Sequence, residues 1–313
     1  MVLARLSLPV HAVWMTDTPL DFNGRVGLVT GAAGGLGLAY TRLLARLGAK
    51  VVMQDVGADR DGEGRDPDRV ASAAARLRVH GLDVTSRALS IDTRAQCHAL
   101  VDEVLGQHGR LDFIIHNAGW VHYQPIEDIS EVQLERMLDI ATKAPLWLAQ
   151  AAWPAMRAAG GGRIVLTTSD RALYPQYVQH GLASYAMAKG GAVGLMNVLA
   201  AEGEAHNIMV NAVSPVAKTR MWGVHGEPDE LHPDAVAPGV AWLASSRCRQ
   251  GGWVLRASNG QFHATRTQEP AGVSYPRDLR GVSAASVEAF DAAWPEIALP
   301  AIEPRSRHRA LLP

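Results

Sequence analysis

Short apolar runs rich in Val and Ile alternate along the chain with longer stretches in which apolar positions recur every three or four residues. This alternation predicts parallel strands joined by crossover helices, because a strand covered by helices on both faces reads as an apolar run. The sequence therefore predicts an α/β fold with one doubly wound parallel sheet. We expect its seven strands near 25–30, 50–55, 88–91, 111–116, 163–168, 208–213 and 253–256, and helices near 36–47, 68–79, 94–108, 131–157, 184–205 and 233–245.

Composition narrows the classes of function. Thirty basic and thirty-one acidic residues give a net charge of −1, so no bulk field draws nucleic acid or an anionic membrane. The two cysteines, Cys97 and Cys248, cannot build a disulfide framework, and the histidines show no metal-binding spacing, so we expect no metal. No apolar run is long enough to span a bilayer, and the run 2–14 contains Arg5, Pro9 and His11, which disfavours a signal peptide. We expect a cytoplasmic protein.

A glycine-rich turn follows the first predicted strand. Gly31, Gly35 and Gly37, with Leu36, stand between a Val-rich strand and an apolar-periodic helix. Glycine lets the backbone turn tightly and approach a phosphate, and the amides at the start of the helix then face the anion. Glycines also form plain turns, but this context favours a Rossmann-type dinucleotide site.

Asp55 ends the second predicted strand, where an acidic side chain accepts hydrogen bonds from the adenosine ribose hydroxyls. A carboxylate there repels a 2′-phosphate, so NAD is favoured over NADP. Arg60 and Arg65 in the next loop leave NADP open, because either could fold back toward a phosphate. Asp55 could also cap a helix or lie in solvent at the strand end.

Two further positions belong to the predicted coenzyme site. Asp92 could contact the adenine edge, or it could cap the helix that opens at Thr93 or Arg94. The run Asn117, Ala118 and Gly119 follows the fourth strand, where small residues let the backbone pass close to a ribose. Asn117 could also tie neighbouring strands together.

Tyr185 and Lys189 are four residues apart in a helical segment, so their side chains share one face. A phenol with a pKa of about 10 is a weak base at neutral pH. A nearby ammonium and a cationic nicotinamide ring would both lower the pKa of Tyr185, which would then take the proton of an alcohol while hydride leaves the same carbon. Ser169 is the candidate that polarises the substrate oxygen, with Thr168 as the fallback.

These four motifs, in this order, resemble the short-chain dehydrogenase/reductase family over residues 24–256. Within it, the segments 51–57, 151–153, 214–221 and 233–238 look like the (3R)-hydroxyacyl-CoA dehydrogenase unit of the peroxisomal multifunctional β-oxidation enzyme. The resemblance implies catalysis by Ser169, Tyr185 and Lys189, and a homodimer or homotetramer built on the long fourth and fifth helices. It implies coenzyme binding by the glycine-rich turn, Asp55, Asp92, residues 117–119, Lys189, Pro215 and Val216.

The chain departs from the family pattern at three places. Ala141 stands where the family commonly has an asparagine that holds a proton-relay water. Ser169 lies sixteen residues before Tyr185 instead of thirteen, which indicates a three-residue insertion beside the pocket. Pro215 and Val216 replace Pro-Gly, which crowds the nicotinamide side of the site.

The chain then divides into an N-terminal extension, 1–23, a dinucleotide-binding catalytic domain, 24–256, and a C-terminal arm, 257–313. Pro145 and Pro154 predict a kink or an early break in the fourth helix. Residues 57–68 should form an exposed loop, and residues 286–293 a short helix in an arm that lies over the domain or a neighbouring subunit.

The expected function is oxidation of a secondary alcohol, with a hydroxyacyl-CoA, an alicyclic alcohol or a steroid as substrate. Lys218 and Arg220 are the only weak candidates for coenzyme A phosphates. A dinucleotide-binding regulatory protein with little turnover is the alternative, suggested by Ala141 and the longer loop. Loop residues expected near the substrate, each of which could instead simply pack, are Trp120, His122, Tyr174, Tyr177, His180, Met221 and Trp222.

Overall fold

The computed structural model describes residues 19–223, 226, 228–269 and 271–298. Eight strands form one sheet in the order β3-β2-β1-β4-β5-β6-β7-β8. The first seven are parallel, and β8 pairs antiparallel with β7 at one edge. The strands are β1 Val26–Thr30, β2 Lys50–Gln54, β3 Val84–Arg87, β4 Phe113–His116, β5 Gly162–Thr167, β6 Ile208–Val216, β7 Val254–Ser258 and β8 Gln261–Thr265.

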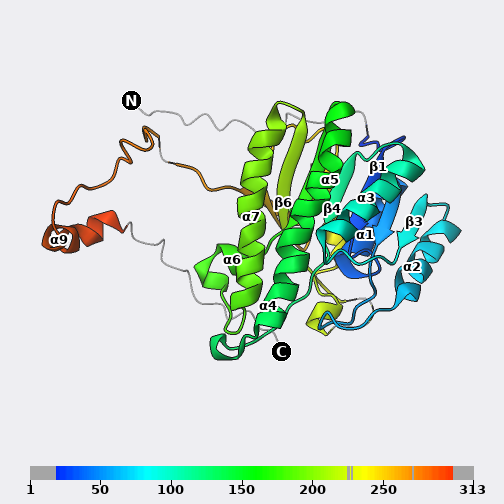
Figure 1. Ribbon diagram of the computed structural model, residues 1–313, viewed down its shortest axis with the longest axis horizontal. Coiled ribbons are helices and arrows are strands. Elements are labelled where there is room, and N and C mark those ends of the chain that lie inside the picture. Colours follow the sequence, from blue (N-terminus) through cyan, green and yellow to red (C-terminus); the bar gives the residue numbers. More distant parts are fainter. Residues whose placement is uncertain (1–18, 224–225, 227, 270, 299–313) are drawn as a thin grey trace, which may run out of the picture.

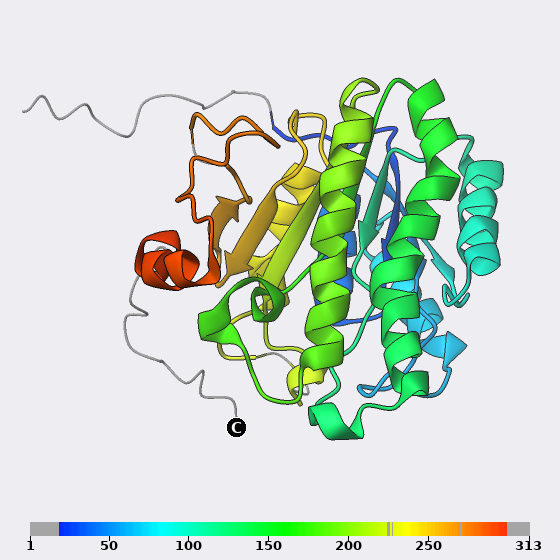
Figure 2. The same ribbon diagram turned by 60° about the vertical axis from the view of Figure 1, so that its left-hand side comes forward.

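Helices cover both faces of the sheet (Figures 1 and 2). One core joins the sheet to α1 Gly35–Arg46, α2 Pro67–Val79 and α8 Ala237–Leu243. The other joins it to α3 Arg94–His108, α5 Ala144–Ala158 and α7 Ala183–Glu204. The remaining helices are α4 Glu131–Leu138, α6 Asp170–Leu173, α9 Val287–Ile297, a π segment Asp139–Lys143, and 3₁₀ turns at Ile126–Asp128, Pro175–Tyr177, Arg220–Trp222 and Pro233–Ala235.

The predicted α/β architecture is confirmed, with two corrections to the strands. The third strand is Val84–Arg87, so its expected place at 88–91 is wrong. Pairing with β2 ends where Gln54 meets Arg87, and the chain beyond is held by the Gln54 amide, which donates to the Leu89 carbonyl at 2.6 Å. The second correction is β8, which extends the sheet beyond the predicted boundary at 256 to Thr265.

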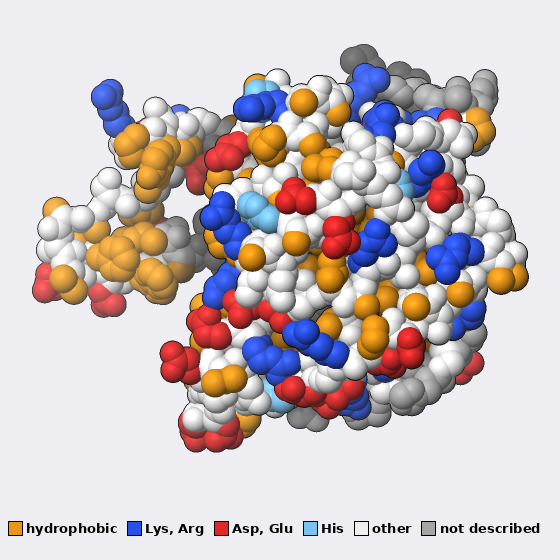
Figure 3. Space-filling view, turned by 45° about the vertical axis from the view of Figure 1, so that its right-hand side comes forward, with side chains coloured by type: hydrophobic (Ala, Val, Ile, Leu, Met, Phe, Trp, Pro, Cys, Tyr) orange, Lys and Arg blue, Asp and Glu red, His pale blue; other side chains and the backbone are white. Residues whose placement is uncertain are grey.

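Beyond β8 the chain leaves the sheet and carries α9 (Figure 1). Ser286 caps α9, and no residue of this helix is buried. The expected helix near 286–293 is therefore present but longer. The hydrophobic side chains on this arm stand apart from a body on which basic and acidic side chains are interspersed (Figure 3). Residues 1–18, which hold the apolar run 2–14, lie outside the described part, and the three-part division of the chain stays a prediction.

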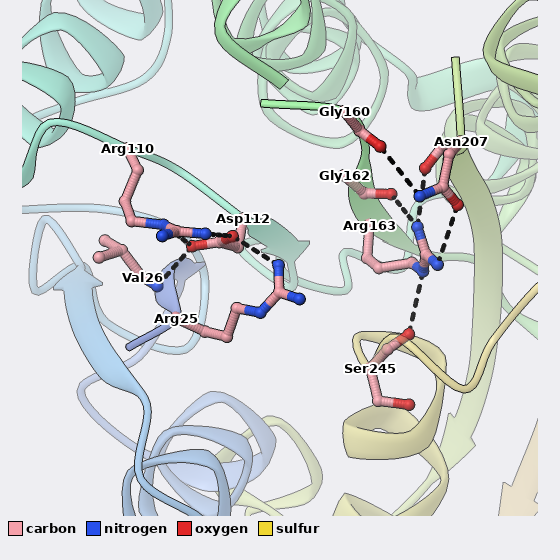
Figure 4. A network of polar contacts seen from close by, with 9 residues as sticks. All are labelled: Arg25, Val26, Arg110, Asp112, Gly160, Gly162, Arg163, Asn207 and Ser245. Carbon is pink, nitrogen blue, oxygen red and sulfur yellow. Dashed lines mark hydrogen bonds and ion pairs between the residues drawn. The ribbon is translucent and has the colours of Figure 1, made fainter. Parts of the chain in front are cut away.

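Charged side chains brace the amino ends of the strands, opposite the end where ligands bind in such sheets (Figure 4). Burial raises the pKa of Asp112, but hydrogen bonds from Arg110, the Val26 amide and Arg25 outweigh it, so this pKa is lowered. Arg163, 6% exposed, donates to the carbonyls of Ser245, Gly162 and Asn207 at 2.9, 2.7 and 2.8 Å.

None of the helices in the described part of the chain is long and apolar enough to cross a bilayer.

Candidate active site

A cleft of about 1400 Å³ opens at the carboxyl ends of the strands. Its walls come from the glycine-rich turn, the ends of β2, β4, β5 and β6, and the start of α7. Of the predicted site residues, the cleft is lined by Gly31, Gly35, Leu36, Asp55, Asp92, Asn117, Ala118, Gly119, Ser169, Tyr185, Lys189, Pro215 and Val216. Residues more than 150 positions apart in sequence thus meet in one space.

The glycine-rich turn leaves a backbone surface facing the cleft. Gly31 has φ +64°, and a side chain on it would lie 2.9 Å from the Ala118 Cα. Gly34 precedes α1 without a side-chain cap, so the first amides of the helix are not occupied by a capping side chain. Gly37 does not line the cleft: a Cβ there would lie 2.1 Å from the Gly31 carbonyl oxygen. Its part is therefore to let α1 pack against the turn.

Asp55 links this turn to the second strand. Its carboxylate accepts hydrogen bonds from the amides of Ala33, at 2.9 Å, and Gly57, at 2.8 Å. Each carboxylate oxygen has two lone pairs, so ribose hydroxyls could still donate to it. The carboxylate faces the cleft at the carboxyl end of β2, where the sequence places the adenosine ribose.

The hydrogen bonds of the structure bear on the alternative roles predicted for Asp92 and Asn117. Thr93 caps α3 in a capping box with Gln96, so Asp92 is not the cap. Asp92 lines the cleft and lies 3.7 Å from Arg65. The Asn117 amide donates to the carbonyls of Thr30 and Gly31 at 3.3 and 3.1 Å, so this residue ties two strand ends together while also lining the cleft.

A mostly exposed loop, residues 57–66, lines the end of the cleft that contains Asp55, and arginines hold it. Arg69 and Arg220 both donate to the Ala58 carbonyl, at 2.8 and 3.0 Å. Arg136 donates to the Gly62 carbonyl at 2.6 Å and pairs with Glu63. The Arg136 guanidinium also lies 5.4 Å over the Trp120 ring, against which Gly62 packs. The exposed loop was predicted from sequence, but its attachment over the cleft was not.

Tyr185 and Lys189 lie on the inner face of α7 and are 9% and 4% exposed. The Lys189 Nζ donates to the Thr167 carbonyl at 3.0 Å and lies 5.9 Å from the centre of the Tyr185 ring. Thr168 donates to the Lys189 carbonyl at 2.8 Å, so this hydroxyl fixes the helix and is not free for a substrate. Ser169 also lines the cleft, and its hydroxyl acts to lower the pKa of Tyr185. Hydroxyl, phenol and ammonium therefore converge.

Burial governs the protonation of this group. It raises the pKa of Tyr185, and the hydrogen bond with Ser169 only partly offsets the rise. It lowers the pKa of Lys189 to about 8. The sequence led us to expect a Tyr185 pKa below its usual value. In the protein alone the pKa lies above it, because loss of water outweighs the neighbouring charges.

His116, missed by the sequence analysis, supports the strand end beside this group. It is 1% exposed, its Nε2 lies 2.9 Å from the Ile140 carbonyl, and its Nδ1 lies 3.1 Å from the Thr30 hydroxyl. A carbonyl only accepts, so Nε2 carries the proton and Thr30 donates to Nδ1. Burial and the Lys189 charge lower the pKa of His116 to about 3, so the ring stays neutral.

The carbonyl that His116 uses is freed by a change in helix type. Residues 139–143 form a π segment in which the Ala144 amide bonds to the Asp139 carbonyl. The Ile140 carbonyl would then take an amide from Pro145, which has none. The kink expected at Pro145 is thus a π segment, with Ala141, 1% exposed, on its buried side.

Only some of the loop residues predicted to lie near the substrate line the cleft. Trp120, Tyr177 and Met221 line it, whereas His122, Tyr174 and His180 do not. The side chain of Trp222 lies outside the described part. Among described residues, no group of His, Cys, Asp and Glu is placed to hold a metal ion.

Known proteins with similar sequences show the family to which this chain belongs. The family model described as short chain dehydrogenase matches residues 25–227. The mouse peroxisomal multifunctional enzyme type 2 is 33% identical over 82% of this chain, which covers 34% of that enzyme. A short-chain type dehydrogenase/reductase of Mycobacterium tuberculosis is 32% identical over 88% of this chain and 96% of its own length. This chain thus spans about a third of the mouse relative.

Solved structures of short-chain dehydrogenases and oxidoreductases share the fold of this chain. A short chain dehydrogenase from Mycobacterium avium superposes with a TM-score of 0.73 at 26% identity, over 88% of this chain and 95% of that one. A metagenomic short-chain oxidoreductase in complex with NADP gives 0.62 at 29% identity, over 74% and 95%. The family model and the fold define the class of protein as an oxidoreductase of the dehydrogenase/reductase type. The chain belongs to the short-chain dehydrogenase/reductase family, and its relatives include peroxisomal multifunctional enzymes.

Proposed function

We propose that this protein is an NAD-dependent oxidoreductase that interconverts a secondary alcohol and a ketone, with Tyr185 as the general acid and base. One observation carries the proposal: Ser169, Tyr185 and Lys189 converge in the cleft that Asp55 and the glycine-rich turn also line. A nicotinamide dinucleotide bound along that turn would supply a hydride acceptor at its ring.

In the direction of alcohol oxidation, the Tyr185 phenolate accepts the hydroxyl proton of the substrate while hydride leaves the carbinol carbon. Ser169 donates a hydrogen bond to the substrate oxygen and holds it beside the phenol. Because burial raises the pKa of Tyr185, the phenolate needs a compensating positive charge. The Lys189 ammonium supplies it at neutral pH, since the pKa of Lys189, about 8, keeps this group mostly protonated.

Asp55 supports NAD as the coenzyme, since its carboxylate faces the cleft where a 2′-phosphate would lie. Arg60 and Arg65, which also line the cleft, lie 3.7 Å from Asp61 and Asp92 and so have acidic partners. Titration should show tighter binding of NAD than of NADP, and Asp55→Ser should narrow the difference. Equal affinities in the wild-type protein would contradict the NAD assignment.

The residues that line the cleft indicate which class of substrate it suits. Trp120, Tyr177 and Met221 give it an apolar and aromatic side, which suits an alicyclic alcohol, a steroid or the acyl part of a hydroxyacyl thioester. Lys218 pairs with Glu230 at 2.9 Å and does not line the cleft, so Arg220 alone remains of the two candidates for coenzyme A phosphates. Arg220 already donates to the Ala58 carbonyl, so a neutral ring-bearing alcohol is the substrate class we favour.

Turnover is the test of the proposal. The protein is incubated with NAD and a panel of secondary alcohols, and NADH absorbance is followed for the wild type and Tyr185→Phe. NADH formation in the wild type that is lost in the variant supports the enzyme. Coenzyme binding without turnover in either protein overturns it and leaves the regulatory function suggested by Ala141.

Assembly and location are further parts of the proposal. Met187 and Val198 on α7 are both 57% exposed, and such apolar side chains suit a subunit contact along this helix and α5. We expect light scattering to give a dimer or tetramer, and a fluorescent fusion to lie in the cytoplasm. A monomer, or a punctate organelle pattern, would contradict the respective expectation.

A further inference from the structure

Asp170 directly follows Ser169 and is held by two side chains from the neighbouring strands β6 and β7. The Arg256 guanidinium donates to its carboxylate through Nε, at 3.0 Å, and Nη2, at 2.8 Å. The Ser214 hydroxyl donates to the other carboxylate oxygen at 2.7 Å. The two side chains of the ion pair are 26% and 16% exposed, so water screens it only in part.

Strand pairing sets up this arrangement. Ser214 on β6 is the register partner of Arg256 on β7, so both side chains project from the same face of the sheet. They meet the carboxylate from adjacent strands at the cleft end of the sheet. Asp170 and Arg256 both line the cleft.

The segment braced in this way is too short to be rigid by itself. Helix α6 has four residues, starts at Asp170 and is capped by Ser169, whose hydroxyl accepts from the Arg171 amide at 3.2 Å. A single helical turn is unstable without outside contacts. The rotation of this turn sets where the Ser169 hydroxyl points.

The same guanidinium orders the longer loop before Tyr185. It lies 4.6 Å over the ring of Tyr174 and 5.5 Å over that of Tyr177. Arg171 adds a hydrogen bond to the Tyr177 carbonyl at 2.7 Å. The segment between Ser169 and Tyr185 therefore packs two aromatic rings against a charge that comes from the sheet.

From these contacts we infer that Arg256 is a positioning residue for Ser169 and, through Tyr174 and Tyr177, shapes the substrate wall of the cleft. Arg256 acts through Asp170, which it locks against the sheet, and makes no contact with the reacting atoms. The inference rests on the proposed oxidoreductase function for its kinetic part only.

The kinetic test is a double-mutant cycle. Arg256→Gln should lower kcat about 10- to 100-fold, because a small misplacement of a catalytic group is costly, while NAD affinity stays unchanged. In a Ser169→Ala background the same change should lower kcat less than about twofold, since the group it positions is gone. A loss of equal size in both backgrounds would overturn the inference.

The structural test needs no turnover. Hydrogen exchange followed by mass spectrometry should be faster over residues 169–182 in Arg256→Gln and in Arg256→Gln/Asp170→Asn, which leaves no unpaired charge. Arg25→Gln is the matched control: it breaks a 2.8 Å ion pair with Asp112 at the other end of the strands. Unchanged exchange over 169–182 in both Arg256 variants would overturn the inference, whereas absence of turnover in the wild type would overturn only the proposed function.

Discussion

The two ends of the cleft are held in place by different kinds of interaction. At the reacting end, Tyr185, Lys189 and His116 are nearly inaccessible, and burial shifts the pKa of each. At the end that contains Asp55, the roof of the cleft, residues 57–66, is mostly exposed and is held by arginine contacts to backbone carbonyls and to Glu63. Burial fixes geometry firmly but penalises charge, whereas exposed contacts fix it loosely and are screened by salt.

The largest difference between the two ends should be seen on removing the Tyr185 hydroxyl. Tyr185→Phe is expected to lower kcat by about 10²- to 10⁴-fold, as is usual for loss of a general acid or base. NAD affinity should hardly change, since the roof is untouched. Tyr275→Phe, on a residue that is 82% exposed on the arm, is the control. Steady-state kinetics and a binding titration check this, and a fall in NAD affinity that explains the loss would count against the assignment.

Lys189→Met should abolish activity and yet raise the free energy of unfolding. The folded pKa of Lys189 is about 8, below the unfolded 10.5, so the unfolded chain binds more protons between these values and wild-type stability rises with pH there. At pH 7 the free energy of unfolding of the variant should exceed that of the wild type by up to about 3 kcal/mol, reduced by the loss of the hydrogen bond to Thr167. The variant should be inactive. Urea unfolding at neutral and alkaline pH measures this. A constant stability difference across that window would show that burial does not penalise the ammonium.

His116→Gln probes the same penalty at acid pH. The folded pKa of His116 is about 3 and the unfolded value 6.5, so the unfolded chain binds the extra proton and wild-type stability falls as the pH drops through this window. Glutamine can accept from Thr30 and donate to Ile140, yet it does not titrate. Between pH 7 and about pH 4.5, the free energy of unfolding should fall by about 2.5 kcal/mol less in the variant than in the wild type. Parallel losses in urea unfolding would contradict the assigned neutral ring.

The smallest effect is expected at the roof. Arg136→Gln removes one exposed ion pair and one carbonyl contact, worth about 0.5–1 kcal/mol, and should weaken NAD binding about two- to fivefold. The difference from wild type should shrink as salt is raised. Arg87→Gln, which breaks an ion pair with Glu103 at 2.7 Å on the outer strand β3, should leave NAD binding unchanged. A salt-independent loss in calorimetry would mean that the roof is not held electrostatically.

Local patterns predicted the parts of the site that depend on local spacing. The glycine-rich turn, Asp55 at a strand end, and Tyr185 four residues before Lys189 are each set by a few neighbouring residues, and all but Gly37 line the cleft. The pairing of Asp170 with Arg256 joins residues 86 positions apart, and periodicity carries no signal for it.

The sequence analysis also missed His116 and strand β8, for two different reasons. His116 reads as the last residue of an apolar strand, and its partners on β1 and in the π segment become visible only in three dimensions. Strand β8 is exposed along most of its length, so it lacks the apolar run that marked the central strands.

The central claim is that the Tyr185 phenol takes the substrate proton beside the nicotinamide. A crystal structure of the complex with NAD tests it most directly. We expect the Tyr185 Oη to face the C4 edge of the nicotinamide, with the Lys189 Nζ at the adjacent ribose and Ser169 across the substrate space. A phenol that points away from that edge, with no rotamer able to reach it, would contradict the account.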